Sequence, residues 1–107
     1  MNTTIRELND RFRQGDTTLG QHVMTPGVQA LAPDELMQLI RLVRDFDQFT
    51  SDNDPHGEHD FGRVTLSGKN YFFKIDYYDP TLRVHSVDPA SPNATRRVMT
   101  LMKASEY

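Results

Sequence analysis

Hydrophobic residues recur at helical spacing in two stretches of the chain. In the first, apolar side chains lie three or four residues apart before a glycine, so we expect a short helix over residues 5–14. In the second, a proline and two acids precede a long apolar stripe, which predicts a core-packing helix over residues 33–48. The weaker pattern of residues 19–30 indicates a short strand and a turn. Three arginines of the first helix are expected to face solvent: Arg6, Arg11 and Arg13.

Between residues 60 and 85 the pattern changes to alternation, which is typical of strands. Apolar and polar residues alternate on both sides of the turn-forming residues 67–70, so we expect a β-hairpin. A third strand is expected around residues 82–85, after the Asp79-Pro80 turn. From Ser91 onward, a serine cap, a proline and one apolar face predict a last helix.

This order of elements predicts a single α+β domain over residues 1–107. We expect a small antiparallel sheet of about three to four strands, covered by about three helices, because the order helix, short strand, helix, strands, helix fits this arrangement. A chain of 107 residues is long enough for one modest core.

The amino-acid composition excludes some kinds of site and indicates the kind of partner. The chain has no cysteine, so disulfides and thiolate zinc sites are excluded. It shows neither the apolar segment of a secretion signal nor a run long enough to cross a bilayer, so we expect a cytoplasmic protein without a membrane partner. A net charge of −3 is unusual for proteins that bind nucleic acid, so we expect a protein partner and no direct nucleic-acid contact. The oligomeric state stays open.

Three stretches of the chain resemble an uncharacterised bacterial family, a domain of unknown function. They read TPGVQAL, DFDQFTSDNDPHGEHDFG and KIDYYDPTLRVHSVDPASPNATRRVMTLMKASEY. Members of the family share the patterns N-D-P-x-G-E-H-D-F-G and K-I-D-Y-Y-D, and the resemblance spans residues 9–107. It implies no activity, but it implies occurrence among plasmid, phage and other mobile-element genes.

The segment DNDPHGEHDFG, residues 52–62, concentrates acids and histidines and resembles two metal motifs. It matches neither, since Arg63 stands where a calcium loop needs its last glutamate, and the two histidines are one residue too close for a metalloprotease helix. A looser divalent-metal site, in a small metal-dependent hydrolase or metal-binding domain, remains an alternative. Its expected ligands are His56, Glu58, His59 and Asp60.

Two further interpretations of these acids remain. In one, the side chains hold the loop's own backbone, with Pro55 and Gly57 restricting it. In the other, they form a negative contact surface that a basic partner recognises. The residues expected on that surface are Asp45, Asp47, Asp52, Asp54, Glu58, Asp60, Asp76, Tyr78 and Asp79.

Without a nucleophile–base pair, the sequence favours a non-enzymatic function with no catalytic residues and no cofactor. We expect an inhibitor encoded by a mobile element, similar to anti-CRISPR proteins, that uses its acidic surface to block a basic nucleic-acid-binding site on a host defence complex. A CRISPR effector subunit is the partner this suggests. A competing set of basic contact residues lies near the C-terminus: Arg96, Arg97 and Lys103.

Overall fold

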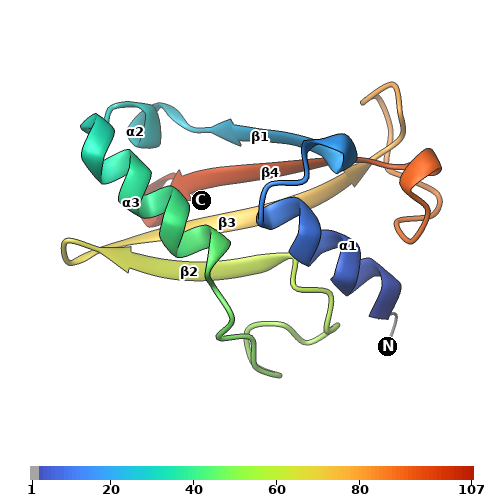
Figure 1. Cartoon of the computed structure of the whole chain (residues 1–107), viewed down its shortest axis with the longest axis horizontal. Coiled ribbons are helices and arrows are strands. Elements are labelled where there is room, and N and C mark those ends of the chain that lie inside the picture. Colours follow the sequence, from blue (N-terminus) through green and yellow to red (C-terminus); the bar gives the residue numbers. More distant parts are fainter. Residues whose placement is uncertain (1–2) are drawn as a thin grey trace.

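The computed structural model describes residues 3–107 and contains one four-stranded sheet (Figure 1). Residues 1 and 2, part of the predicted domain, lie outside the described residues. The strands are β1 (Gly20–Met24), β2 (Phe61–Leu66), β3 (Lys69–Tyr78) and β4 (Arg96–Lys103). They lie in the order β1-β4-β3-β2, and β1 is parallel to β4 while the other pairs are antiparallel. The α+β class is therefore confirmed, with a mixed sheet.

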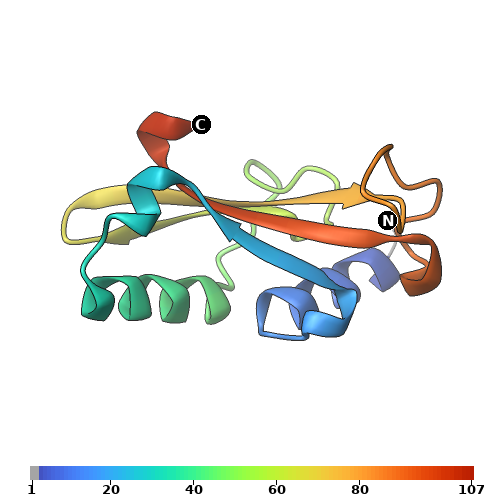
Figure 2. The same ribbon diagram turned by 90° about the horizontal axis from the view of Figure 1, so that it is seen from above.

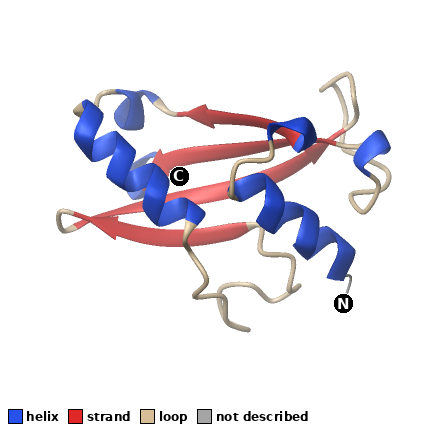
Figure 3. Cartoon of the chain, viewed as in Figure 1, coloured by secondary structure: helices blue, strands red, loops and turns tan. Residues whose placement is uncertain are grey.

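Two longer helices lie on one face of this sheet (Figure 2). They are α1 (Thr3–Arg13) and α3 (Pro33–Arg44), and the short helix α2 (Pro26–Gln29) follows β1 (Figure 3). Single 3-10 turns are η1 (Thr17–Leu19), η2 (Pro92–Ala94) and η3 (Ala104–Glu106). Both expected helices are confirmed, although α3 ends four residues before the expected boundary at 48. No helix within residues 3–107 is long and apolar enough to span a bilayer.

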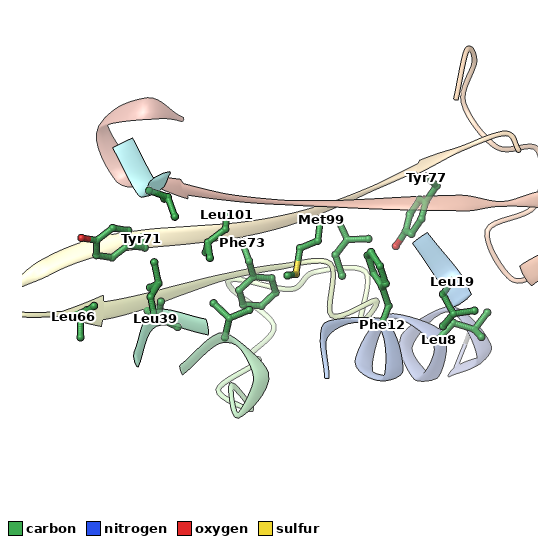
Figure 4. Close-up of a cluster of buried hydrophobic side chains, with 14 residues drawn as sticks. Leu8, Phe12, Leu19, Leu39, Leu66, Tyr71, Phe73, Tyr77, Met99 and Leu101 are labelled. Atoms are coloured by element: carbon green, nitrogen blue, oxygen red, sulfur yellow. The ribbon is translucent and has the colours of Figure 1, made fainter. Parts of the chain in front are cut away.

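The core lies between the sheet and these two helices (Figure 4). Alternate residues of β3 point into it, as the pleat requires: Tyr71, Phe73, Ile75 and Tyr77. Phe12 of α1 and Leu39 of α3 are fully buried against this face. Burial of such side chains contributes roughly 1.5–3 kcal/mol each, so the inward face of the sheet fixes where both helices lie.

The hairpin of β2 and β3 is confirmed, with a tighter turn than expected. β2 ends at Leu66 and β3 begins at Lys69, so only two residues form the turn. Ser67 and Gly68 both have positive φ, at 52° and 75°. This geometry matches the right-handed twist of paired strands and sets the register of the hairpin.

The last helix predicted after Ser91 is wrong. Residues 96–103 form β4, a central strand that is hydrogen-bonded to β1 on one side and β3 on the other. Arg97, Met99 and Leu101 are buried on its inward face, and the residues between them are half-buried. The apolar residues of this segment fit both a helical and a strand period, and pairing with two neighbours decides in favour of the strand.

The third strand predicted around residues 82–85 is also wrong. Only one isolated bridge, between Tyr78 and His85, joins this segment to the sheet in the described part of the chain. Asp79 instead holds the segment as a loop, because its Oδ1 accepts from the backbone amides of Arg83 (2.9 Å) and Val84 (3.3 Å).

Candidate functional site

A network of hydrogen-bonded polar side chains links α1, the loop of residues 52–60, β3 and β4. Asn9 Nδ2 donates to the Tyr77 hydroxyl over 2.7 Å, and that hydroxyl donates to Glu58 Oε1 over 2.7 Å. Arg97 Nε donates to Asn9 Oδ1, also over 2.7 Å. Asn9 and Arg97 are 0% exposed. Buried polar groups that are hydrogen-bonded to one another specify a unique arrangement, so this network ties the loop to the sheet.

Burial also sets the protonation of the network. Desolvation raises the pKa of the Tyr77 hydroxyl far above its usual value, and its hydrogen bond to Glu58 raises the pKa further. Tyr77 is therefore a neutral donor at physiological pH, which does not suit it to nucleophilic chemistry. Desolvation lowers the pKa of Arg97, whose Nη2 donates to the carbonyl of Pro89 over 2.6 Å. The guanidinium lies 5.2 Å from the centre of the Tyr77 ring.

Asp54 holds the loop from inside. It is 7% exposed, and its Oδ1 accepts from the backbone amides of Glu58 (3.1 Å) and His59 (3.2 Å). Gly57 and His59 have positive φ, at 66° and 57°, which bends the backbone toward this carboxylate. The interpretation that the loop's own side chains support its backbone is confirmed for Asp54.

His59 is held between a ring and two carboxylates. Its imidazole stacks on Phe49, with ring centroids 3.8 Å apart and planes 5° apart. Its Nδ1 lies 2.8 Å from Asp10 Oδ1, and its Nε2 lies 3.8 Å from Asp54 Oδ2. Among the described residues, no hydroxyl group is hydrogen-bonded to His59. A histidine in this setting is oriented, but it lacks the nucleophile that it would activate.

A surface hollow of about 450 Å³ opens beside His59. Asp10 and Arg13 of α1 lie on one side, and Asp45 and Asp47, which follow α3, lie on the other. Asp10 is paired with Arg13 over 2.9 Å, so its charge is already compensated. Arg44 also lines the hollow, but within residues 3–107 neither Asp45 nor Asp47 is within ion-pair distance of a basic side chain.

The four side chains expected to bind a metal do not form one preformed ligand set in residues 3–107. Glu58 is bonded to Tyr77, His59 to Asp10, and His56 is exposed. Desolvation raises the pKa of Asp60, and the negative charge of Glu58 raises it further. Residues 3–107 contain no group of three or more histidine, aspartate or glutamate side chains placed to hold a metal ion. The metal alternative thus remains a prediction without a preformed ligand set in this range.

The nine residues expected on one acidic surface lie in several places. Asp45, Asp47 and Asp52 are exposed in the segment between α3 and β2. The Asp54 carboxylate accepts from amides of its own loop, the Glu58 carboxylate accepts from Tyr77 of β3, and Asp60 is half-buried.

The remaining three are not part of that segment. Asp76 and Tyr78 belong to β3 and alternate with its buried residues, so they lie on the face opposite the helices. Asp79 holds the loop that follows β3. Asp45 and Asp47 therefore line one hollow, Asp52 lines another, and neither hollow includes Asp76, Tyr78 or Asp79.

Sequence reasoning missed the contribution of α1. Asn9 belongs to the network, Asp10 contacts His59, and Arg13 pairs with Asp10. Arg13, expected to face solvent, is 3% exposed. Its guanidinium lies 5.2 Å from the centre of the Phe49 ring and donates to the carbonyl of Phe46 over 3.3 Å. The available signal was the spacing of Asn9 and Arg13, which places both on the apolar side of the helix.

These features define a small α+β protein with one sheet, two helices on one face and an ordered acidic loop. Residues 24–106 match the family DUF3768, described as a protein of unknown function, and the chain belongs to this family. No curated protein and no solved structure matches the chain.

Proposed function

We propose that the protein is a non-enzymatic inhibitor that binds a protein partner through an acidic edge. We define the acidic edge as Asp45, Asp47 and Asp52. All three are exposed, and within residues 3–107 none is within ion-pair distance of a basic side chain. This set of exposed, uncompensated carboxylates is the observation that carries the proposal.

Unpaired charges favour binding because they lose no internal ion pair when a partner arrives. Asp45 and Asp47 border the hollow beside His59, and Asp52 borders a second hollow that contains Phe46. The three acids therefore lie on one stretch of the chain, and this stretch borders two hollows. A basic partner would be attracted along this stretch, which raises the association rate and fixes its orientation.

Hydrogen bonds within the segment between α3 and β2 hold the backbone around the acidic edge in the free protein. Asn53 Oδ1 accepts from the amide of Thr50 over 2.9 Å, and Asn53 Nδ2 donates to the carbonyl of Gln48 over 3.0 Å. The amide of Asp54 donates to the carbonyl of Thr50 over 2.8 Å. Binding through a preformed loop avoids part of the entropy that ordering a flexible segment would cost.

We infer that the partner's surface is one that otherwise binds phosphates. A groove rich in lysine and arginine complements the acidic edge, and nucleic-acid channels have this character. The mobile-element setting expected for similar proteins favours a host defence complex, with a CRISPR effector subunit as the first candidate. The protein would then act as an anti-CRISPR inhibitor.

A competition experiment tests this function. The purified protein is incubated with each of a panel of CRISPR effector complexes before labelled target DNA is added, and DNA binding is followed by gel mobility shift. We expect one effector or more to lose DNA binding, with less inhibition at high salt because exposed charges are screened. Unchanged DNA binding across the panel would contradict the proposed target.

A further inference from the structure

The face of the sheet opposite α1 and α3 is covered by neither helix (Figure 2). Residues of β2, β3 and β4 that alternate with the core positions lie on this face. Six of them share a cationic or aromatic character: Phe61, Arg63, Phe72, Lys74, Tyr78 and Arg96. We call this set the open face.

Its charge is opposite to that of the whole chain. The chain has a net charge of −3, yet Asp76 is the only acid in the sequences of β2, β3 and β4. Asp76 lies 3.4 Å from Lys74 and compensates one cation. Arg63 and Arg96 are without an ion-pair partner within the described range. The open face therefore favours an anionic ligand and repels the same face of a second copy.

Aromatic rings alternate with these cations. In the register of the hairpin, Phe61 pairs with Lys74 and Arg63 pairs with Phe72. The rings of Phe61 and Phe72 are half-buried, with centroids 5.1 Å apart, and Tyr107 meets the edge of the cluster at 5.5 Å from Phe72. An acidic peptide would form ion pairs with the cations, but its carboxylates would not stack on the aromatic rings.

A hollow of about 440 Å³ is continuous with this cluster. Phe61, Arg63 and Phe72 line it together with Phe46, the polar side chains of Gln48 and Asn53, and the carboxylate of Asp52. A concave space beside aromatic rings and a guanidinium suits a planar, polar group such as a nucleobase.

We propose that the open face binds single-stranded nucleic acid. Phe61 and Phe72 provide stacking surface for a base at the hollow, and Arg63, Lys74 and Arg96 contact the phosphates along the strands. Sheets with aromatic and basic side chains on one face bind single strands in this way, whereas the bases of a duplex are already stacked. Asp52 of the acidic edge also borders this hollow, whereas the rings and cations of the open face are not used in the proposed function.

Fluorescence anisotropy with a labelled 12-nucleotide single strand, in DNA and RNA versions, tests the proposal. We expect binding at low salt that is at least about ten-fold tighter than to the matching duplex, because only the single strand presents free base faces. Phe72→Leu keeps an apolar side chain but loses the stacking ring, so affinity should fall about five-fold or more. Arg63→Gln should reduce the slope of log K against log salt by about 0.7.

Arg41→Gln is the matched control, because Arg41 is exposed on α3, on the helical side of the sheet. It should leave both affinity and salt slope unchanged. Arg63 is exposed on the edge strand β2, so its substitution tests the proposal even if Phe72→Leu does not fold. No binding of either strand at low salt, equal loss in Arg41→Gln and Arg63→Gln, or displacement by polyglutamate as effective as by unlabelled oligonucleotide overturns the proposal. The last result would indicate an acidic protein ligand instead.

Discussion

Asp52 and Asp54 are two residues apart in the sequence, but burial gives them different roles. Asp52 is exposed, while Asp54 is buried and accepts backbone amides from the far end of its own loop. The sequence alone predicts both as surface acids, because their neighbours are polar and contain proline and glycine. Burial depends on the packing of the loop against α1, which no local pattern encodes.

The role of Asp54 is tested by Asp54→Ala. The substitution leaves the amides of Glu58 and His59 without their acceptor, so we expect a loss of about 1–3 kcal/mol in the free energy of unfolding. Asp52→Ala removes an exposed carboxylate from the same loop and should change stability by less than about 0.5 kcal/mol. Urea unfolding of both variants measures the difference, and equal stabilities would show that Asp54 does not support the loop.

Asp60 gives stability a pH dependence of defined sign. Because burial and Glu58 raise its pKa in the folded protein, the folded state binds a proton more tightly than the unfolded state. Its contribution to stability is therefore present at acid pH and is lost as pH rises through the raised pKa. Asp60→Asn should raise the melting temperature at neutral pH, and the gain should shrink toward about pH 4, near the unperturbed range. A variant that melts below the wild type at neutral pH would contradict this.

At the scale of secondary structure, helices and the hairpin are predictable because each has a local signal. Pro33 with its two acids begins α3, and strict alternation identifies β3. β4 is not predictable in this way, since its segment follows a serine and a proline that suit a helix start. Its strand form depends on pairing with β1, which lies more than seventy residues earlier in the chain.

Gly20 tests that parallel pairing. A Cβ at this position would collide with the backbone of Arg97, its partner in β4. Gly20→Ala should therefore force β1 away from β4 and destabilise the protein by about 1–3 kcal/mol, as overpacked substitutions do. Gln21→Ala, on the next, exposed residue of β1, is the control and should be nearly neutral. Thermal unfolding of the two variants measures the contrast, and a stable Gly20→Ala protein would contradict the close approach of the strands.

At the scale of the whole molecule, folding places most acids of the edge and most cations of the open face on different elements, and the two sets meet at the hollow lined by Asp52 and Arg63. The acidic edge lies on the segment between α3 and β2, and the basic residues of the open face lie across the sheet from α1 and α3. From the sequence, the exposure of Asp45 and Asp47 was predictable because they lie outside the apolar stripe of the helix expected over residues 33–48. The open face was not, because its cations come from three strands, one of which was expected to be a helix.

The most direct test of the acidic edge compares two triple variants that remove the same charge. Asp45→Asn, Asp47→Asn and Asp52→Asn neutralise the edge, whereas Glu7→Gln, Asp34→Asn and Glu35→Gln neutralise three acids of α1 and α3. Their affinities for a CRISPR effector that the wild-type protein inhibits are measured by biolayer interferometry at low and high salt. We predict at least about ten-fold weaker binding, with a reduced salt dependence, for the edge variant alone. Equal affinities for the two variants would contradict the proposal that the acidic edge makes the contact.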